Sequence, residues 1–290
     1  KDNKDRPFFC YLPTTPPHGI FDIPDSDPAW AIYKDREEWP EQARRYAAMV
    51  GMVDRQVGQV LDLLKELKLD ENTIVFFCGD NGGNNYFRTP DHPRGIHSAN
   101  KNPKTGVEFR GGKGNLYEGG LRIPMAIRWP GVVIPGTICE EPVIGIDLYP
   151  TLLEATQTNR PSNVRLDGTS LMPLLKNAKA KLFRQAIYWH FPAYLQGYTR
   201  RHGPFRTTPC GAVRMGDWKL IEYFESGALE LYNLTNDLGE KKNLAKTETE
   251  RLTQLHTMLK AWRLSTNAPV PKEKNPKFDP VAYSKTFKKD

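Results

Sequence analysis

The chain is 290 residues long, with 39% hydrophobic and 26% charged residues and a formal net charge of +7 at pH 7. This composition is that of an ordinary globular protein, with enough chain for one large core or two moderate ones. No apolar run approaches the roughly 18 residues of a membrane-spanning helix, and no basic patch interleaved with aromatic residues indicates a nucleic-acid module. We therefore expect neither a membrane span nor a nucleic-acid partner, and we interpret the positive charge as suited to an anionic ligand.

The first third of the chain has the pattern of a strand, a helix and a second strand. Residues 7–12 form a short continuous apolar run, which is typical of a strand buried on both faces. Between residues 41 and 68, apolar side chains recur at spacings of three and four, which predicts a long amphipathic helix. Residues 73–78 repeat the buried-strand pattern, so the order predicts a right-handed βαβ unit.

Polar candidate residues follow both of these strands. His18 lies just past the run 7–12, and Asp80 and Asn81 come directly after residues 73–78. Because ligands bind at the carboxyl ends of parallel strands, these side chains are predicted to lie at the same edge of the sheet. A carboxylate and an amide carbonyl are oxygen ligands suited to Ca²⁺ or Mg²⁺. The alternative is that Asp-Asn-Gly-Gly is simply a turn.

A glycine-rich stretch carries Lys113. From residue 111 the sequence reads Gly-Gly-Lys-Gly-Asn-Leu-Tyr-Glu-Gly-Gly-Leu-Arg-Ile-Pro. Glycines let an ammonium group and nearby backbone N–H groups crowd one anion, so Lys113 is a candidate anion-binding residue. The alternative is one more solvated lysine. Arg122 is expected to pair with Glu118 and not to touch a ligand.

The remainder of the chain predicts one more strand and helix and then an antiparallel region. Residues 124–129 have a strand pattern, and Asp147 is expected to cap a helix that runs through Leu153. After about residue 177 the expected elements are a strand at 186–190, a hairpin of 212–224 with 229–234 around Glu225–Gly227, and a helix over roughly 247–265. We therefore expect two domains, 1–177 and a smaller α+β domain, 178–290, with an extended tail.

Taken together, Pro17-His18, Asp80-Asn81 and the Lys113 stretch resemble the later part of the sulfatase family. These are formylglycine-dependent sulfuric ester hydrolases of the alkaline-phosphatase superfamily. The resemblance implies part of an alkaline-phosphatase-like α/β/α sandwich, with a small C-terminal subdomain of antiparallel sheet plus helix. It implies that Asp80 and Asn81 bind a metal, Ca²⁺ or alternatively Mg²⁺. It also implies that His18 and Lys113 are catalytic and bind the sulfate.

Further candidates come from other segments. His190 lies in a stretch that resembles the wall of the substrate pocket in some sulfatases, which makes it an additional candidate for substrate binding. Four residues form a cationic loop that could recognise a sulfated or carboxylated sugar: Arg200, Arg201, His202 and Arg206. His92 and His97 lie in a loop that could shape substrate access or could simply face solvent.

One motif of the family is absent from these 290 residues. None of the four cysteines is followed by x-Pro-x-Arg, the sequence in which a sulfatase Cys or Ser becomes formylglycine. We interpret the chain as about the C-terminal two-thirds of a sulfatase, and we expect the formylglycine and two further metal-binding aspartates upstream of Lys1. The chain alone is then expected to be inactive. The signal region for a periplasmic, secreted or lysosomal location would also lie outside it.

The function expected from this resemblance is hydrolysis of a sulfate ester, with a sulfated carbohydrate or an aryl sulfate as the partner. One alternative is a phosphonate monoester or phosphodiester hydrolase of the same superfamily. Another is a non-catalytic protein that binds sulfated glycans without turnover.

Overall fold

The structure is a computed structural model that describes residues 3–84, 100–196 and 205–281. The chain divides into two compact units. Unit 1 comprises residues 1–78, 86–98 and 125–138, and unit 2 comprises residues 79–85, 99–124 and 139–290. The expected domain boundary at residue 177 stays a prediction.

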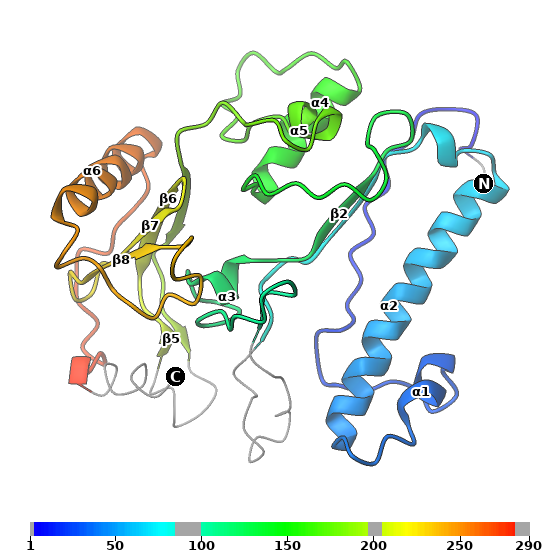
Figure 1. Cartoon of the computed structure of the whole chain (residues 1–290), viewed down its shortest axis with the longest axis horizontal. Helices are drawn as coiled ribbons and strands as arrows, with labels where there is room; N and C mark the ends of the chain where they lie inside the picture. Colours follow the sequence, from blue (N-terminus) through cyan, green and yellow to red (C-terminus); the bar gives the residue numbers. More distant parts are fainter. Residues whose placement is uncertain (1–2, 85–99, 197–204, 282–290) are drawn as a thin grey trace. The chain divides into compact units, whose positions relative to one another are not determined.

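Unit 1 is built around the predicted long helix. Helix α2 spans Glu41–Glu66, which confirms the prediction, and the short helix α1, Pro28–Tyr33, packs against it (Figure 1). The buried core of this unit consists of Phe21, Ile23, Ala29, Trp30, Ala48 and Met49. Asp27 caps α1 by accepting from Ala29 N at 2.8 Å, and its carboxylate also receives both terminal nitrogens of Arg55 on α2 at 2.8 and 2.7 Å. The cap therefore also fixes the two helices to each other.

The two strands of unit 1 correct the expected βαβ unit. Strands β1, Val75–Cys78, and β2, Met125–Arg128, occur where predicted but pair with each other in antiparallel register. Residues 7–12 do not form a strand: Phe9 and Tyr11 are 77% and 78% exposed, and no described strand pairs with this run. An apolar run becomes a buried strand only where a neighbouring strand accepts its backbone hydrogen bonds. The described residues offer none.

Unit 2 contains a four-stranded antiparallel sheet with the strand order β3-β6-β7-β8. The strands are β3 Ile187–Phe191, β6 Cys210–Met215, β7 Trp218–Tyr223 and β8 Leu229–Asn233. Two shorter strands, β4 Leu195–Gln196 and β5 Phe205–Thr207, pair with each other in a separate two-stranded sheet. Helix α6, Thr249–Thr266, covers one face of the sheet, where Val213, Leu220, Leu231, Leu255 and Leu259 are fully buried (Figure 1).

The opposite face of this sheet carries a different set of side chains. Because side chains alternate along a strand, Ala212, Ile221 and Tyr232 point away from α6. They pack around Tyr117, which lies in the glycine-rich stretch. The sheet therefore supports the Lys113 region on the face that α6 leaves open.

The antiparallel region follows the predicted order with one correction. The hairpin around Glu225–Gly227 forms between β7 and β8, as predicted. The preceding stretch 212–224 is not one arm but two strands, β6 and β7, which reverse at Gly216 and Asp217. Gly216 has φ +57°, a conformation that favours glycine.

Asp147 stands at the N-cap of helix α4, Leu148–Ala155, as predicted, but its side chain makes no cap bond to that helix. It accepts instead from Ile144 N at 2.9 Å, which closes the 3₁₀ turn Gly145–Asp147, and from Arg184 Nη1 at 2.8 Å. A short helix, α5 Met172–Lys176, follows.

None of the described helices combines the length and the apolar character that a bilayer crossing requires.

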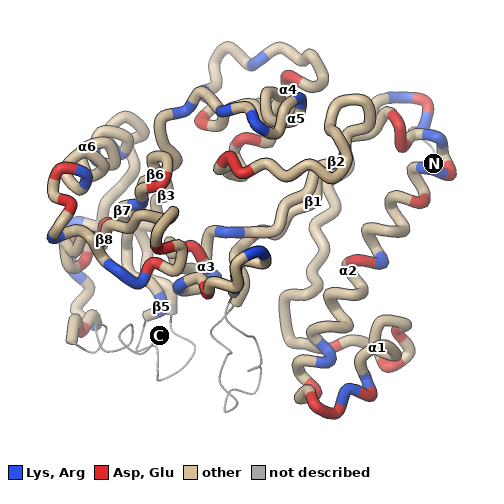
Figure 2. Tube along the Cα trace, in the orientation of Figure 1, with Lys and Arg blue, Asp and Glu red and all other residues tan. Residues whose placement is uncertain are grey.

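Positively and negatively charged residues both occur along the whole of the described chain. Figure 2 shows basic and acidic residues interspersed along the described trace. This pattern is typical of a solvated protein surface.

Candidate functional site

The structure brings the Asp80-Asn81 pair and the Lys113 stretch together within unit 2. Lys113 N donates to Gly83 O at 3.0 Å, and Gly82 N donates to Gly120 O at 3.0 Å. Asn100 Nδ2 reinforces the junction by donating to Gly83 O at 2.8 Å and to Gly119 O at 3.0 Å. We call residues 80–83 the metal loop and residues 110–121 the lysine loop. The two loops form one hydrogen-bonded assembly.

Glycines are required where these loops meet. A Cβ atom on Gly82 would lie 2.1 Å from Gly119 O, and one on Gly120 would lie 2.2 Å from Asn115 O. A Cβ atom on Gly119 would lie 2.5 Å from the carbonyl oxygens of Arg110 and Gly111. Each distance is well inside van der Waals contact, so backbone packs directly on backbone. The short helix α3, Glu118–Leu121, carries two of these three glycines.

Two hydrogen-bonded groups fix the lysine loop to the four-stranded sheet. In the first, Tyr117 Oη donates to Glu230 Oε2 at 2.7 Å and receives Tyr223 Oη at 2.8 Å. The Arg110 guanidinium lies 4.1 Å from the centre of the Tyr117 ring and donates to Tyr232 Oη at 2.7 Å. Burial, followed by the charge of Glu230, raises the pKa of Tyr117 well above its usual value, so the phenol stays protonated as a donor.

The second group is a buried ion cluster, which we call the charge cluster: Glu118, Lys219 and Glu240. Lys219 Nζ lies 2.9 Å from Glu118 Oε1 and 2.8 Å from Glu240 Oε1, and the side chains are 0–3% exposed. Glu118 N also donates to Glu240 Oε2 at 2.7 Å, and Arg122 Nε donates to Glu118 Oε2 at 2.5 Å. The predicted pairing of Arg122 with Glu118 is confirmed.

Charges within the cluster determine its protonation. Burial alone would raise the pKa of Glu118, but the adjacent charges of Lys219 and Arg122 outweigh it and hold that pKa at about 2. Burial would lower the pKa of Lys219, yet the two carboxylates raise it. At neutral pH Glu118 and Lys219 are therefore ionised, with Arg122 as a second cation.

Asp80 and Asn81 fit a metal by their chemistry, but not by their number. Both are exposed, and Asn81 Nδ2 donates to Asp80 Oδ2 at 2.7 Å. A carboxylate and an amide supply the oxygen ligands that Ca²⁺ or Mg²⁺ prefers, whereas Ca²⁺ takes about 6–8 oxygens. Among the residues that the structure describes, no group of three His, Cys, Asp or Glu side chains could hold a metal. Further ligands would have to come from elsewhere.

The two predicted histidines belong to other segments of the chain than the metal loop and the lysine loop. His18 is exposed in a turn of unit 1, where its backbone N donates to Thr15 O at 2.9 Å. His190 lies on β3, with Nε2 2.7 Å from Pro269 O and its ring against Phe224 and Trp262. That hydrogen bond fixes the His190 ring in the subdomain. Substrate binding by either histidine stays a prediction.

Of the predicted cationic loop, only Arg206 lies within the described residues; Arg200, Arg201 and His202 lie outside them, as do His92 and His97. Arg206 stands on β5 and is 7% exposed. Asn115 Nδ2 donates to Arg206 O at 3.0 Å and to Thr207 Oγ1 at 2.9 Å. These bonds place β5 beside the lysine loop.

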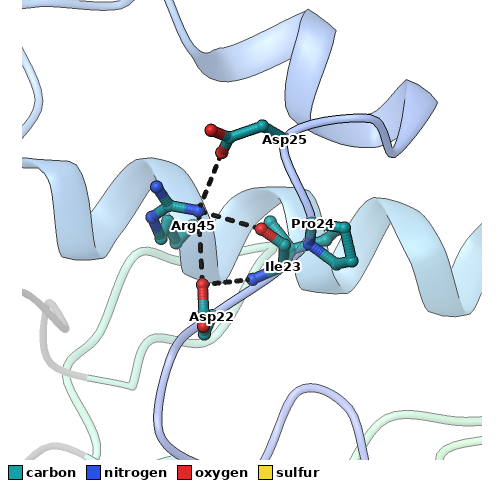
Figure 3. A pocket seen from close by; sticks show the side chains of 5 residues that line it. All are labelled: Asp22, Ile23, Pro24, Asp25 and Arg45. Carbon is teal, nitrogen blue, oxygen red and sulfur yellow. Dashed lines mark hydrogen bonds and ion pairs between the residues drawn. The ribbon is translucent and has the colours of Figure 1, made fainter.

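Unit 1 has a separate open pocket, lined by Asp22, Ile23, Pro24, Asp25 and Arg45 (Figure 3). Arg45 Nη1 donates to Ile23 O at 2.9 Å and lies 3.3 Å from both aspartates. The only cation lining this pocket is therefore neutralised by carboxylates. This geometry fastens the segment 22–25 to α2 and is unsuited to a sulfate ion.

Sequence reasoning missed the residues beneath the lysine loop. Lys219 on a strand looks like a solvent-facing side chain, and Glu240 lies in a turn for which no chemical role was expected. The only available signal was the period of two along β7, which places Lys219 on the same face as Ile221.

Comparison with protein families gives two matches. The family described as "Sulfatase" matches residues 1–158, and the family described as "N-sulphoglucosamine sulphohydrolase, C-terminal" matches residues 112–266. The chain is 32% identical to a protein named Sulfatase from Formosa agariphila, over 93% of this chain and 48% of that protein. It is 28% identical to the uncharacterized sulfatase YdeN of Escherichia coli, over 96% of this chain and 50% of that protein. The chain thus spans about half the length of these curated relatives.

Solved structures show the same fold. The crystal structure of Ps i-CgsB in complex with k-i-k-neocarrahexaose matches with a TM-score of 0.71 and 28% identity, over 99% of this chain and 58% of that chain. A putative sulfatase from Bacteroides fragilis matches in fold with a TM-score of 0.60 at 24% identity, over 88% of this chain and 53% of that chain. These likenesses confirm the predicted α/β fold class with its small antiparallel subdomain.

Proposed function

The chain belongs to the sulfatase family, and on this premise we propose that it is part of an enzyme that hydrolyses sulfate esters. The observation that carries the proposal is the 3.0 Å bond from Lys113 N to Gly83 O. It joins a glycine-rich loop suited to an anion to a pair of oxygen ligands suited to a divalent cation. A sulfate ester needs both, because negative charge has to be stabilised on its oxygens and on the departing alkoxide.

Each site residue then has a role. Lys113 binds the sulfate and assists the departure of the alkoxide, and His18 is a second sulfate contact that serves as general acid. Asp80 and Asn81 hold Ca²⁺, or alternatively Mg²⁺, which supplies Lewis-acid stabilisation of the sulfate oxygens. The nucleophile that these residues serve would be a formylglycine outside these 290 residues.

We propose a sulfated carbohydrate as the substrate, with an aryl sulfate as a simpler alternative. The similar structure that carries a bound neocarrahexaose supports a carbohydrate ligand. Arg206, on the strand that contacts Asn115 of the lysine loop, is our candidate for recognising a sulfate or carboxylate group on the sugar. A periplasmic, secreted or lysosomal location would suit such a substrate.

The test compares ester classes with the full-length protein. We expect a higher kcat/KM on 4-nitrocatechol sulfate than on an aryl phosphodiester, and release of inorganic sulfate from a sulfated oligosaccharide. A preference for the phosphodiester would identify a phosphorus ester hydrolase. Tight binding of the sulfated sugar with no sulfate released on long incubation would identify a binding protein.

A further inference from the structure

We propose that the charge cluster of Glu118, Lys219 and Glu240 positions the lysine loop and the metal loop. Its members are positioning residues that act through the backbone of α3. This inference rests on the proposed function, because it assigns the sheet of unit 2 a part in the reaction of the same site.

Burial makes this cluster different from the surface ion pairs of the chain. Exposed pairs typically contribute about 0–1 kcal/mol, whereas an ion left unpaired in the interior is strongly unfavourable. Lys219 and Glu240 have fully buried side chains, and that of Glu118 is 3% exposed. Two carboxyl groups face two cations once Arg122 is included. Burial raises the pKa of Glu240, and the adjacent Lys219 opposes that rise. Displacing one member would leave its partners buried and unpaired.

The constraint passes from the cluster to the lysine loop through α3. Glu118 begins α3, and the next two residues, Gly119 and Gly120, contact the backbone of the lysine loop. The loop is also tied internally, because Gly119 N donates to Arg110 O at 2.9 Å. Because these contacts are backbone against backbone, side-chain rotation cannot relieve a shift of α3. Such a shift must move the backbone around Lys113.

The same helix holds the metal loop. Gly120 O accepts Gly82 N at 3.0 Å, and Gly82 has no room for a Cβ atom against Gly119 O. The carbonyl oxygen of the next residue, Gly83, accepts a hydrogen bond from Lys113 N. A single element, α3, therefore sets the backbone next to both Asp80-Asn81 and Lys113, and Glu118 fixes α3 to Lys219.

Strand β7 provides a rigid reference for this anchor. It lies between β6 and β8 in the sheet, and Leu220, next to Lys219, is fully buried under α6. Glu240 comes from the turn after β8, where Asp237 accepts Lys241 N at 3.0 Å and Lys242 N at 2.7 Å. The cluster thus joins the loops to the buried four-stranded sheet of unit 2.

The kinetic test uses Glu240→Gln in the full-length protein. This nearly isosteric change keeps an oxygen for Glu118 N but replaces the carboxyl group beside Lys219 with a neutral amide. We expect kcat on an alkyl sugar sulfate to fall by about 10- to 100-fold, because small misplacements of reacting groups have effects of this size. In a Lys113→Ala background the same change should have little further effect, since it acts through Lys113. Lys219→Met, which removes the central cation, should act in the same direction more strongly.

The matched control is Glu222→Gln on the same strand. Glu222 is partly buried and pairs with Arg263 Nη1 at 2.6 Å and His256 Nε2 at 3.1 Å, away from the loops. This change should lower stability while leaving kcat and KM of the folded enzyme unchanged. Equal kinetic effects from Glu222→Gln and Glu240→Gln, or purely additive effects with Lys113→Ala, would overturn the positioning role.

Hydrogen exchange tests the inference without activity. Exchange of the Lys113 and Gly82 amides should speed up in Glu240→Gln and stay unchanged in Glu222→Gln. If this pattern appears while the full-length protein hydrolyses no sulfate ester, the positioning is supported and the proposed hydrolase is overturned. If the protein is active but Glu240→Gln matches the wild type in exchange and in kcat, the positioning is overturned and the hydrolase stands.

Discussion

Lys113 differs from the other lysines of the chain in its surroundings. It is only partly exposed, flanked by glycines, and held by a backbone bond to the metal loop. In the full-length protein, Lys113→Ala should raise KM through lost sulfate binding, and it should lower kcat through lost help to the leaving group by about 10²–10⁴-fold. The fall in kcat should be large for an alkyl sugar sulfate and small for 4-nitrocatechol sulfate, whose leaving group needs little protonation. The control Lys176→Ala changes an exposed lysine and should have no effect, and unchanged kinetics for Lys113→Ala on both substrates would remove Lys113 from the site.

Asp80 is the charged member of the proposed metal-binding pair. Asp80→Ala should greatly weaken Ca²⁺ or Mg²⁺ binding by the full-length protein, because the charge of a carboxylate contributes most to the affinity of a hard cation. Asp54, exposed on α2, is the matched control. Calorimetric titrations that give the same affinity for Asp80→Ala and Asp54→Ala would contradict the assignment.

Glu118 predicts a pH dependence of stability. Its pKa in the folded protein, about 2, lies below the ordinary value of 4.5, so its contribution is fully present above pH 4.5 and is lost as the pH falls toward 2. Glu118→Gln should therefore lower the free energy of unfolding by about 3–5 kcal/mol at pH 7, and this difference should narrow between pH 4.5 and 2. Chemical denaturation at several pH values measures it. A difference that is constant with pH would show that the carboxylate is not held ionised.

At the scale of elements, α3 depends on glycines for close approach. Gly119→Ala would place a Cβ atom 2.5 Å from two carbonyl oxygens and should destabilise the protein by about 1–3 kcal/mol through overpacking. Gly58→Ala, in the interior of α2 with nothing within 4 Å, should instead stabilise it by about 0.5–1 kcal/mol. Thermal unfolding of both variants tests the opposite signs. If Gly119→Ala left the stability unchanged, the loop backbone would be able to shift and accommodate the Cβ atom without loss of stability.

Local hydrophobic patterns predicted the elements whose buried positions are spaced regularly within the segment itself. The spacing of apolar residues along 41–68 anticipated α2, and the runs at 73–78 and 124–129 anticipated β1 and β2. The prediction for the run 7–12 was wrong because an apolar pattern indicates a tendency to be buried, but it does not show which neighbouring strand would pair with the run. The reversal at Gly216 was missed although Gly216-Asp217, between two strand patterns, is a two-residue hairpin signal.

The site could be predicted only in part, for a similar reason. Asp80, Asn81 and Lys113 stand in sequence contexts that are unusual by themselves, so their meeting could be expected. Lys219 is buried only because Glu118, 101 residues earlier, and Glu240 both converge on it. A single sequence does not display such long-range charge compensation.

At the scale of the whole molecule, these 290 residues supply part of the proposed site. The described residues provide the two proposed metal ligands and Lys113 in a single assembly within unit 2, and the proposed sulfate contact His18 in unit 1. None of the four cysteines stands in the x-Pro-x-Arg context of a formylglycine. Binding groups without a nucleophile hold a substrate without splitting it, because rate acceleration requires the group that attacks in the transition state.

We therefore predict that the purified 290-residue chain does not hydrolyse 4-nitrocatechol sulfate above background, with or without added Ca²⁺. The full-length protein, assayed under the same conditions, is the positive control. Circular dichroism of the chain should show α-helix, since α2 and α6 each pack within their own unit; this check separates lack of a nucleophile from lack of a fold. Metal-dependent turnover by the folded 290-residue chain would overturn this prediction, because the nucleophile would then have to lie among these 290 residues.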